Sequence, residues 1–599
     1  MTAIVTLDQN ALALAQIIKG GLQDARIHGL RKRVDGADVP FDETKAHLQD
    51  LFLSGETIIG ICAAGILIRG LAPVLKDKTE EPPVMAISAD GATVVPLLGG
   101  HHGGNRMADE VAALTGGHAA VTTAGDVRLG VALDEPPDGW RIANPEAAKD
   151  VTARLIAGED VSLKVTCGNP SWLRDARATF TETETTPDIL VTEKSVEGGS
   201  LVMHPPVLAL GVGCERDCPP EDLVRLAEET LSQHALSPLA IACVVSIDVK
   251  MDEPAVLALA RHFDVPARFF DAKTLEAESP RLANPSDVVF EEVGCHGVAE
   301  GAALAAVGPG GTLQIEKHKS QRATCAVGFL GDGFEPALPG RARGTLSIVG
   351  IGPGSTEWRT PAATEALRKA DGVVGYSLYL DLAADVIGDK PRYSSELAQE
   401  EERVRKSLDL AAEGRNIALV CSGDAGIYAL ATLAFELVDR ESRPDWNRLD
   451  ISVTPGVSAF QAAASRMGAP MGHDFCTISL SDLLTPWEEI ERRLKAAAMG
   501  DFVVAFYNPV SKRRRTQLAE AKEILLSARP PQTPVALARN LGREGETLDV
   551  ISLGDLTPDH ADMLTMVIVG NSQTKFFRQG PLDRVYTPRG YASKMEVAE

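Results

Sequence analysis

The stretch Thr345-Leu-Ser-Ile-Val-Gly-Ile-Gly-Pro-Gly354 decides the fold of the second half of the chain. Its apolar, β-branched start predicts a buried strand, and its three glycines predict a tight turn before a helix that begins near Pro361. Such a turn lets backbone amides approach a ligand, although a purely structural turn is an alternative. A dinucleotide site would need its third glycine one position later and an acidic residue about 20 positions on. The pattern therefore argues against a dehydrogenase.

Similar short apolar bursts recur along the chain, each followed by Gly or Asn and separated from the next by a helical pattern. Examples are TIIGICA, VVPLLGG, LAIACVV, NIALVCSG and FVVAFYN. This alternation predicts α/β domains with largely parallel sheets, whose functional loops lie at the carboxyl ends of the strands.

Length and loop composition predict several domains. A chain of 599 residues allows about four domains of ordinary size. The Gly- and Pro-rich stretch FLGDGFEPALPGRAR predicts a linker, and a Thr-rich acidic stretch near Glu182 marks an earlier break. The expected segments are residues 1–130, a middle region 131–205, 206–328, the linker 329–343, a domain at 344–580 and a tail at 581–599.

The net charge of −24 argues against nucleic-acid binding, because phosphate backbones recruit basic surfaces. From Arg341 onward there are 31 basic and 35 acidic residues, which leaves −20 for the first 340. The longest apolar run, 57–68, is shorter than the ~20 residues of a membrane span. No signal peptide is evident, and the nine cysteines form no CxxC pair, which predicts reduced thiols in a cytoplasmic protein.

Five strand-end motifs carry a resemblance to a known family. To the opening stretch they add Cys421–Tyr428, Thr454–Ala459, Ala505–Pro509 and Thr565–Ser572. In this order and spacing, residues 344–577 resemble the tetrapyrrole methylase family. GYSLYLDL from Gly375, SGDAGIYALA from Ser422 and FYNPVSKRR from Phe506 are similar to its precorrin-3B C(17)-methyltransferase subfamily.

The resemblance implies two α/β subdomains around S-adenosylmethionine and a homodimer formed through the methylase domain. It implies methylation of carbon 17 of precorrin-3B with ring contraction to precorrin-4, in cobalamin biosynthesis. Methyl transfer needs an in-line approach, so positioning carries most of the catalysis and no general base is identified. A tetrapyrrole methylase of different regiochemistry, or one acting on protein or RNA, is the alternative.

Matching the family motifs gives the expected cofactor residues, whose carbonyls, hydroxyls and small apolar walls suit the cofactor. They are Pro353, Gly423, Asp424, Ile427, Tyr428, Ser458, Ala459, Tyr507, Asn508 and Thr565. Asp424 and Tyr507 are also the candidate catalytic residues. The alternative for Asp424 is a carboxylate that caps the following helix through backbone N–H groups.

The implied substrate is a polyanion with acetate and propionate arms, so local cations are expected to bind it. Lys512, Arg513 and Arg514 are the candidates, because guanidinium pairs with carboxylate bidentately. A solvated helix start is the alternative for them. Tyr376 and Tyr379 are expected to pack on the macrocycle or to be ordinary core residues.

The first half resembles a second family of the same pathway. Residues 61–78, 96–105 and 121–126 resemble the N-terminal part of the cobalt-precorrin-5A hydrolase family, and 210–216, 293–301 and Lys317 resemble its C-terminal domain. The resemblance implies opening of a lactone and release of a two-carbon fragment. The candidate residues of this hydrolase-like half are Arg69, Lys76, His101, Asn105 and Glu215.

The alternative for these loop residues is ordinary surface exposure. Cys214 and Cys218, with His296, miss the usual zinc spacing, so no metal site is expected. The first half is therefore either a second enzyme or a non-catalytic module that binds a tetrapyrrole. Whether the substrate carries cobalt stays open.

Overall fold

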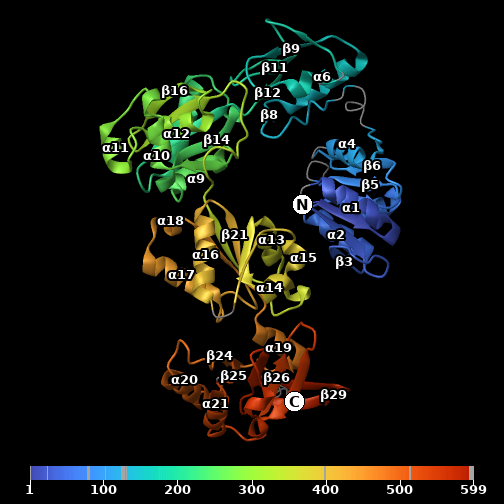
Figure 1. Cartoon of the computed structure of the whole chain (residues 1–599), viewed down its shortest axis with the longest axis vertical. Helices are drawn as coiled ribbons and strands as arrows, with labels where there is room; N and C mark the ends of the chain where they lie inside the picture. The colour runs from blue at the N-terminus through green and yellow to red at the C-terminus, as the bar shows by residue number, and fades with distance from the viewer. Residues whose placement is uncertain are drawn as a thin grey trace. The chain divides into compact units, whose positions relative to one another are not determined.

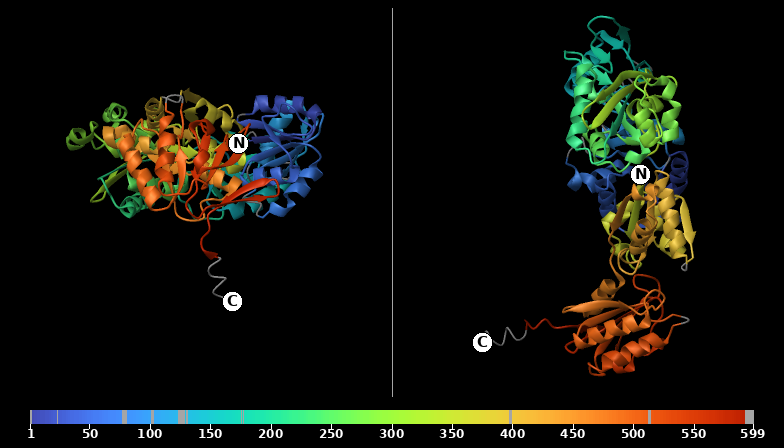
Figure 2. Two further views of the ribbon diagram at one scale, coloured as in Figure 1. Left: turned by 90° about the horizontal axis from the view of Figure 1, so that it is seen from below. Right: turned by 90° about the vertical axis from the view of Figure 1, so that its left-hand side faces the viewer.

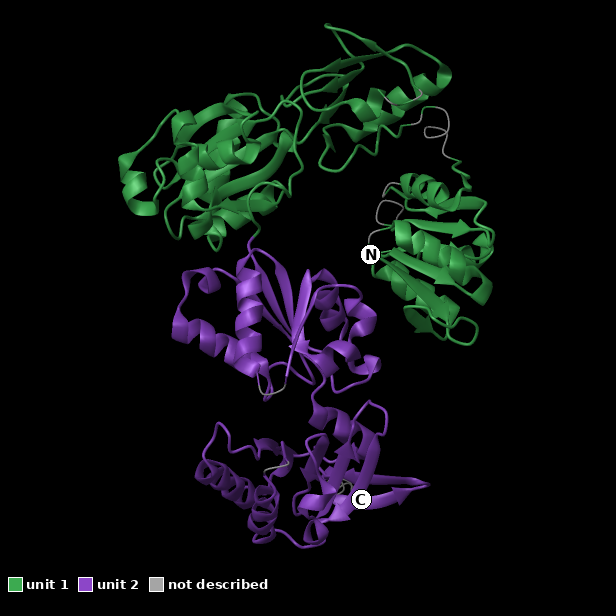
Figure 3. Cartoon of the chain, viewed as in Figure 1, with its two compact units in different colours: residues 1–342 green, residues 343–599 purple. Residues whose placement is uncertain are grey.

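The computed structural model describes residues 2–22, 24–76, 81–100, 103–122, 129, 131–174, 176, 178–396, 399–511 and 514–591. The chain forms two compact units, residues 1–342 and 343–599 (Figure 3). The division falls at the end of the predicted linker. Arg341 still belongs to the first unit, because it exchanges backbone hydrogen bonds with Phe269 at 2.8 and 2.9 Å.

The N-terminal subdomain is a seven-stranded sheet of order β3-β2-β1-β4-β5-β6-β7. Its strands are β1 (Thr2–Thr6), β2 (Ala25–Leu30), β3 (Val39–Phe41), β4 (Thr57–Ile61), β5 (Val84–Ile87), β6 (Thr93–Leu98) and β7 (His118–Ala119). Its helices are α1 (Leu12–Gly21), α2 (Thr44–Leu53), α3 (Ala64–Leu71) and α4 (Gly104–Thr115). Alternate residues of β1 face opposite cores, one built with α1 and α4 and the other with α2 and α3.

The middle region is a small sheet of order β10-β9-β11-β12-β8 with one core. Its strands are β8 (Arg141–Ile142), β9 (Val161–Val165), β10 (Phe180–Glu182), β11 (Ile189–Val191) and β12 (Leu201–His204), and its helices are α6 (Pro145–Ala157) and α7 (Ser171–Arg174). Most strands have only two to five residues, which explains why their periodicity is weak in the sequence.

A carboxylate ties this middle region together. Asp188 accepts hydrogen bonds from Arg154 at 2.6 Å and from the backbone and hydroxyl of Ser162, both at 2.7 Å. The Arg154 hydrogen bond and the Ser162 amide hold the pKa of Asp188 at about 2.

Because the native pKa is depressed, the stabilisation by Asp188 is present above its ordinary pKa and is lost as pH falls toward 2. We expect Asp188→Asn to destabilise the middle region by about 1–2 kcal/mol at pH 7, allowing for solvent screening of Arg154. The difference from wild type should shrink from pH 5 to pH 3. Urea unfolding at a series of pH values measures it, and a pH-independent difference would contradict this role.

The third subdomain of the first unit has a sheet of order β15-β14-β13-β17-β16, with β13, β14 and β15 parallel. The strands are β13 (Leu208–Cys214), β14 (Ile241–Ile247), β15 (Ala267–Phe270), β16 (Thr312–Lys319) and β17 (Ala323–Phe329). The helices are α8 (Pro220–Gln233), α9 (Pro254–His262), α10 (Ala272–Ala277), α11 (Asp287–Val293) and α12 (Val298–Val307). Helices α8 and α9 cover one face, and α10 and α12 cover the other.

The second unit begins with a fully parallel sheet of order β20-β19-β21-β18-β22. Its strands are β18 (Thr345–Gly350), β19 (Gly372–Tyr376), β20 (Arg392–Ser395), β21 (Asn416–Cys421) and β22 (Asp450–Thr454). Its helices are α13 (Pro361–Lys369), α14 (Ser377–Leu382), α15 (Ala384–Ile387), α16 (Glu400–Ala412), α17 (Leu430–Glu441) and α18 (Pro444–Asn447). Helices α16 and α17 pack on one face and α13 to α15 on the other (Figure 1).

The last subdomain departs from the predicted parallel pattern. Its sheet, β24-β25-β28-β26-β27, is parallel only between β24 and β25. The strands are β24 (Phe475–Ser479), β25 (Val503–Tyr507), β26 (Pro534–Arg539), β27 (Thr547–Ser552) and β28 (Thr565–Val569), and the helices are α19 (Ala459–Met467), α20 (Trp487–Met499) and α21 (Thr516–Leu526). The apolar run of β28 has the same pattern in either direction, so its orientation could not be predicted from the sequence.

A separate three-stranded sheet completes this subdomain. It joins β23 (Gly468–Ala469) to a hairpin of β29 (Lys575–Gln579) and β30 (Leu582–Tyr586), which extends away from the main sheet (Figures 1 and 2). In the part of the chain that the structure describes, no helix has the length and apolar character needed to cross a bilayer.

Candidate active site

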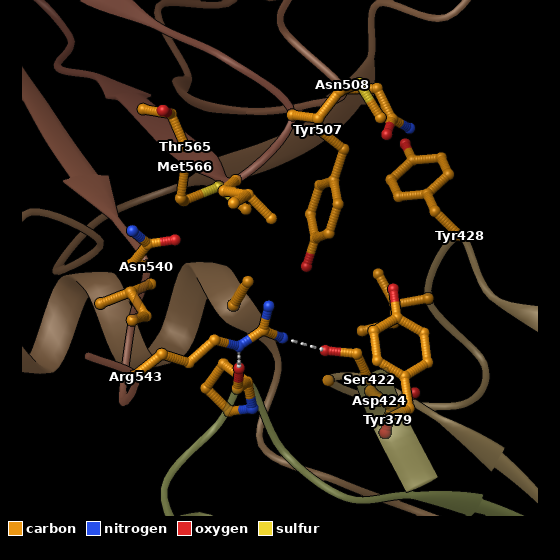
Figure 4. Close-up of a pocket in the computed structure, with 17 residues that line it drawn as sticks. Tyr379, Ser422, Asp424, Tyr428, Tyr507, Asn508, Asn540, Arg543, Thr565 and Met566 are labelled. Carbon is orange, nitrogen blue, oxygen red and sulfur yellow. Dashed lines mark hydrogen bonds between the residues drawn. The ribbon is translucent and has the colours of Figure 1, made fainter. Parts of the chain in front are cut away.

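A cavity of about 210 Å³ lies in the second unit, between its two subdomains (Figure 4). The first subdomain contributes Pro353, Tyr379, Ser422, Gly423, Asp424, Ile427 and Tyr428. The second contributes Ala459, Tyr507, Asn508, Asn540, Leu541, Arg543, Met563, Leu564, Thr565 and Met566. Nine of the ten expected cofactor residues therefore border one cavity.

Strand direction explains why these distant segments meet. In the parallel first sheet, β18 and β21 end at the cavity edge, so their following loops supply Pro353 and Ser422–Tyr428. In the second sheet β25 and β26 also end there. Strand β28 is antiparallel to both, so it brings its first residues, Thr565 and Met566, to the same edge. The motif that begins at Thr565 therefore lies at the start of β28, whereas it was predicted to lie at the end of a strand.

Glycines allow the loops of the first subdomain to pack backbone against backbone. Gly352 and Gly423 exchange hydrogen bonds at 3.1 and 2.8 Å. A Cβ on Gly350 would lie 2.6 Å from the Gly423 carbonyl oxygen, and one on Gly456 would lie 2.2 Å from the same atom. The glycines of the opening motif therefore join three strand-end loops, and the Gly352 amide is used within the protein.

Asp424 connects two of these loops. Its Oδ1 accepts from the Gly426 amide at 2.8 Å and its Oδ2 from the Gly456 amide at 3.1 Å. Helix α17 begins later, at Leu430, and its N-cap Ala429 has no side-chain cap, so Asp424 does not cap the helix and instead stabilises the turn at Gly426. This geometry gives Asp424 a positioning role and leaves its carboxylate beside the cavity.

Backbone strain gathers around the cavity. Tyr428, Asn508 and Asn540 all have left-handed backbone conformations, with φ of 50°, 49° and 52°, and all three line the cavity. Asparagine tolerates this conformation, whereas tyrosine adopts it rarely. Such strain persists where the surrounding structure enforces it, commonly at functional sites.

Two tyrosines pack together from opposite subdomains. The rings of Tyr428 and Tyr507 lie 4.9 Å apart, and the Tyr428 hydroxyl donates to the Thr477 carbonyl at 3.0 Å. Burial raises the pKa of Tyr507 to about 12. Its phenol therefore stays protonated near neutral pH and is a hydrogen-bond donor rather than a base.

The other predicted residues of this unit lie in different surroundings. Ser458 is buried before α19, where its backbone amide donates to the Gln461 side chain at 3.0 Å; it does not border the cavity. Tyr379 lines the cavity, and Tyr376 packs edge-on against it at 5.3 Å. The predictions for Lys512 and Arg513 fall outside the described residues.

Arg514 is not the exposed cation that the sequence analysis expected. It is only 8% exposed, because its guanidinium donates to the Ser481 hydroxyl and the Asn508 carbonyl, both at 3.0 Å. These bonds tie the loop after β24 to the loop after β25. The placement gives Arg514 a structural role, and its contact with substrate stays a prediction.

Arg543 borders the cavity but was not among the predicted site residues. It lies in the loop NLGREGE after β26, where Nε donates to the Pro353 carbonyl at 2.8 Å and Nη2 to the Ser422 hydroxyl at 3.0 Å (Figure 4). An arginine between glycines directly after an apolar strand was the available signal.

The described candidates of the first unit belong to two different sheets. Arg69 in α3 and Lys76 are exposed, and Asn105 lies in the first turn of α4. Glu215 follows β13 of a different sheet and pairs with Arg322 at 3.2 Å. His101 lies outside the described residues. His296 pairs with Glu276 at 2.9 Å.

The fold and cavity define the class of the second unit: a two-subdomain α/β protein with a cavity bordered by its strand-end loops. Residues 345–557 match the profile described as Tetrapyrrole (Corrin/Porphyrin) Methylases. A precorrin-3B C(17)-methyltransferase from Sinorhizobium sp is 45% identical over 250 residues, which are 42% of this chain and 98% of that protein. The chain belongs to the tetrapyrrole methylase family.

Two further comparisons cover similar shares of the chain. A cobalt-factor III methyltransferase from Priestia megaterium is 42% identical over 252 residues, and the match covers 42% of this chain and about half, 46%, of that protein. The crystal structure of the methyltransferase CobJ is 41% identical, with a TM-score of 0.38, over 41% of this chain and 100% of that one.

The first unit matches two other profiles. Residues 46–126 match one described as Cobalamin synthesis G N-terminal, and residues 208–328 match one described as Cobalamin synthesis G C-terminus. Both halves of the chain thus resemble proteins of cobalamin synthesis.

Proposed function

We propose that this protein transfers a methyl group from S-adenosylmethionine to carbon 17 of precorrin-3B or its cobalt-containing counterpart, with ring contraction. The observation that carries the proposal is the cavity between the two subdomains, bordered by nine of the ten residues expected from the family motifs. The relatives named as C(17)-methyltransferases support the position of methylation.

The cavity residues fit this cofactor. Ile427, Leu541 and Met566 offer apolar contacts for an adenine ring. Asn540 and the loop carbonyls offer hydrogen bonds for the ribose and aminoacyl end, and the Asp424 carboxylate lies near enough to the cavity to favour a cation. When bound, the cofactor supplies an electrophilic methyl group.

The protein's own contribution is positioning. The strand-end loops are fixed by the Asp424 bonds and the glycine contacts, and the neutral Tyr507 hydroxyl offers a donor inside the cavity. Holding two reactants in line replaces much of the entropy cost of their encounter. Incubating the full chain with S-adenosylmethionine and either precorrin-3B or cobalt-factor III tests the proposal. The proposal would be contradicted if no S-adenosylhomocysteine were released with either substrate.

An apolar loop that follows β24, and that Arg514 connects to the cavity residue Asn508, suits the face of a macrocycle. Leu483 and Leu484 are 83% and 93% exposed. Their loop follows β24 and is anchored by the Arg514 bond to Ser481 and by a 2.9 Å bond from Gln517 to Asp482. A fixed loop that exposes two leucines gains free energy by covering an apolar ligand.

Replacing both leucines by serine should raise the KM for the tetrapyrrole about 10-fold, because partial burial of two leucines contributes about 1–2 kcal/mol. The affinity for S-adenosylhomocysteine should not change. Met499→Ser is the matched control, because Met499 is 87% exposed but ends α20 shortly before the start of β25, at the end of the strands opposite the leucine loop. An unchanged tetrapyrrole KM would contradict the predicted contact.

The hairpin of β29 and β30 supports a homodimer formed through this unit. Phe576, Phe577 and Leu582 are exposed large apolar side chains on it, and a second copy is the partner that the family resemblance implies. Light scattering of the full chain tests this assembly. The nine cysteines, all described, form no disulfide, which supports the proposed cytoplasmic location.

The profile matches over residues 46–126 and 208–328 favour a second candidate function, hydrolysis of a precorrin-5A-type lactone by the first unit. The full chain should then release a two-carbon fragment from cobalt-precorrin-5A without S-adenosylmethionine. Tight binding without turnover would favour the non-catalytic module instead.

A further inference from the structure

Arg543 brings a positive charge into the cavity without bringing an anion to pair with it. Its guanidinium donates two hydrogen bonds to neutral acceptors of the first subdomain, the Pro353 carbonyl and the Ser422 hydroxyl. A guanidinium has five N–H donors, so three remain after these bonds. Figure 4 shows the group among the cavity side chains, beneath the Tyr507 hydroxyl.

Among the described residues, no carboxylate lies within 4.0 Å of the Arg543 guanidinium. The acid in the same cavity, Asp424, uses both oxygens on backbone amides. Arg539, four residues earlier, shows the contrasting arrangement, because its Nε pairs with Asp562 at 2.8 Å.

The Arg543 guanidinium is also partly desolvated. Burial lowers its pKa, and the Tyr379 phenol opposes this effect. A desolvated charge without a counterion is costly. Gly354 nevertheless leaves room for the Arg543 side chain. A Cβ at Gly354 would lie 2.5 Å from the Arg543 Cγ, so only glycine fits at this position.

We propose that Arg543 is the binding site for a carboxylate of a ligand held in the cavity. The proposal rests on the proposed function, which supplies two sources of that group. One is the aminoacyl carboxylate of the cofactor, and the other is an acetate or propionate arm of the tetrapyrrole. The fixed guanidinium, already held by Pro353 and Ser422, pairs with either by parallel N–H···O bonds.

Binding of two probes to the full-length protein separates the sources: S-adenosylhomocysteine, and uroporphyrin III as a stable octacarboxylate tetrapyrrole. Arg543→Gln should weaken one of them at least about 30-fold, the loss expected for removing one partner of a partly buried ion pair. Weaker S-adenosylhomocysteine binding identifies the cofactor carboxylate, and weaker uroporphyrin binding identifies the substrate arm. Arg543→Lys should restore part of the loss, and the wild-type affinity for that probe should fall with salt.

Two variants separate the charge from the structural bonds. Ser422→Ala removes one hydrogen bond of Arg543 and keeps its charge, so it should weaken the affected probe less than 3-fold. Arg578→Gln removes an exposed arginine paired with Asp583 and should change neither affinity. The inference is overturned if Arg543→Gln leaves both probes within 2-fold of wild type, or if Ser422→Ala matches its effect. Failure of the wild-type protein to bind either probe would instead contradict the proposed function.

Discussion

Gly456→Ala is expected to reduce methyl transfer at least about 100-fold and to destabilise the second unit by about 1–3 kcal/mol. The new Cβ would lie 2.2 Å from the Gly423 carbonyl oxygen and 2.6 Å from that of Gly350. Both contacts are with backbone, which cannot rotate away. Relief therefore requires the Asp424 loop to move, and a shift of about 1 Å at reacting groups is enough to lose this much rate.

The matched control is Gly20→Ala, because a Cβ at Gly20 meets nothing within 4 Å. The measurements are kcat/KM with precorrin-3B and thermal unfolding of the full chain. Wild-type kcat/KM in Gly456→Ala would show that the close packing of the three loops is not needed for activity.

Asp424→Ala is expected to lower kcat/KM about 100-fold, and Asp424→Asn about 10-fold or more. Asp424 accepts from two amides, those of Gly426 at 2.8 Å and Gly456 at 3.1 Å. Asparagine can keep only one of these bonds, because its NH₂ group cannot accept. Each variant leaves a backbone donor without its partner, which costs about 1–3 kcal/mol.

Separate measurement of kcat and of the KM for S-adenosylmethionine defines what Asp424 does. If the carboxylate only holds the loops, its replacement lowers kcat and the melting temperature together. If it also balances the positive charge of the cofactor, Asp424→Asn raises the KM for S-adenosylmethionine. Unchanged kcat and KM in both variants would contradict any role for this residue in the site.

The strand-end motifs predicted the architecture of the second unit because each combines an apolar strand with a glycine turn, a pattern with few structural solutions. These motifs contain Gly423 and Tyr507, which both border the cavity. The antiparallel direction of β28 was not predicted, because an apolar strand carries no mark of its orientation. The burial of Arg514 was not predicted, because a basic run is usually solvated, whereas here the side chain donates to Ser481 and Asn508.

Arg543 was missed for a different reason. Its partners Pro353 and Ser422 are 190 and 121 positions away in sequence, so only the folded chain brings them together. In the first unit, the motifs predicted α/β subdomains, but Glu215 lies on a different sheet from the other candidates and pairs with Arg322.

The central claim is methylation of carbon 17, and the position of the transferred methyl group tests it most directly. The full chain should be incubated with precorrin-3B and S-adenosylmethionine carrying a ¹³C-labelled methyl group, and the product analysed by NMR. We predict a single new label on carbon 17 of a ring-contracted product, lost in Gly456→Ala. A label on another carbon, or on the protein itself, would contradict the account.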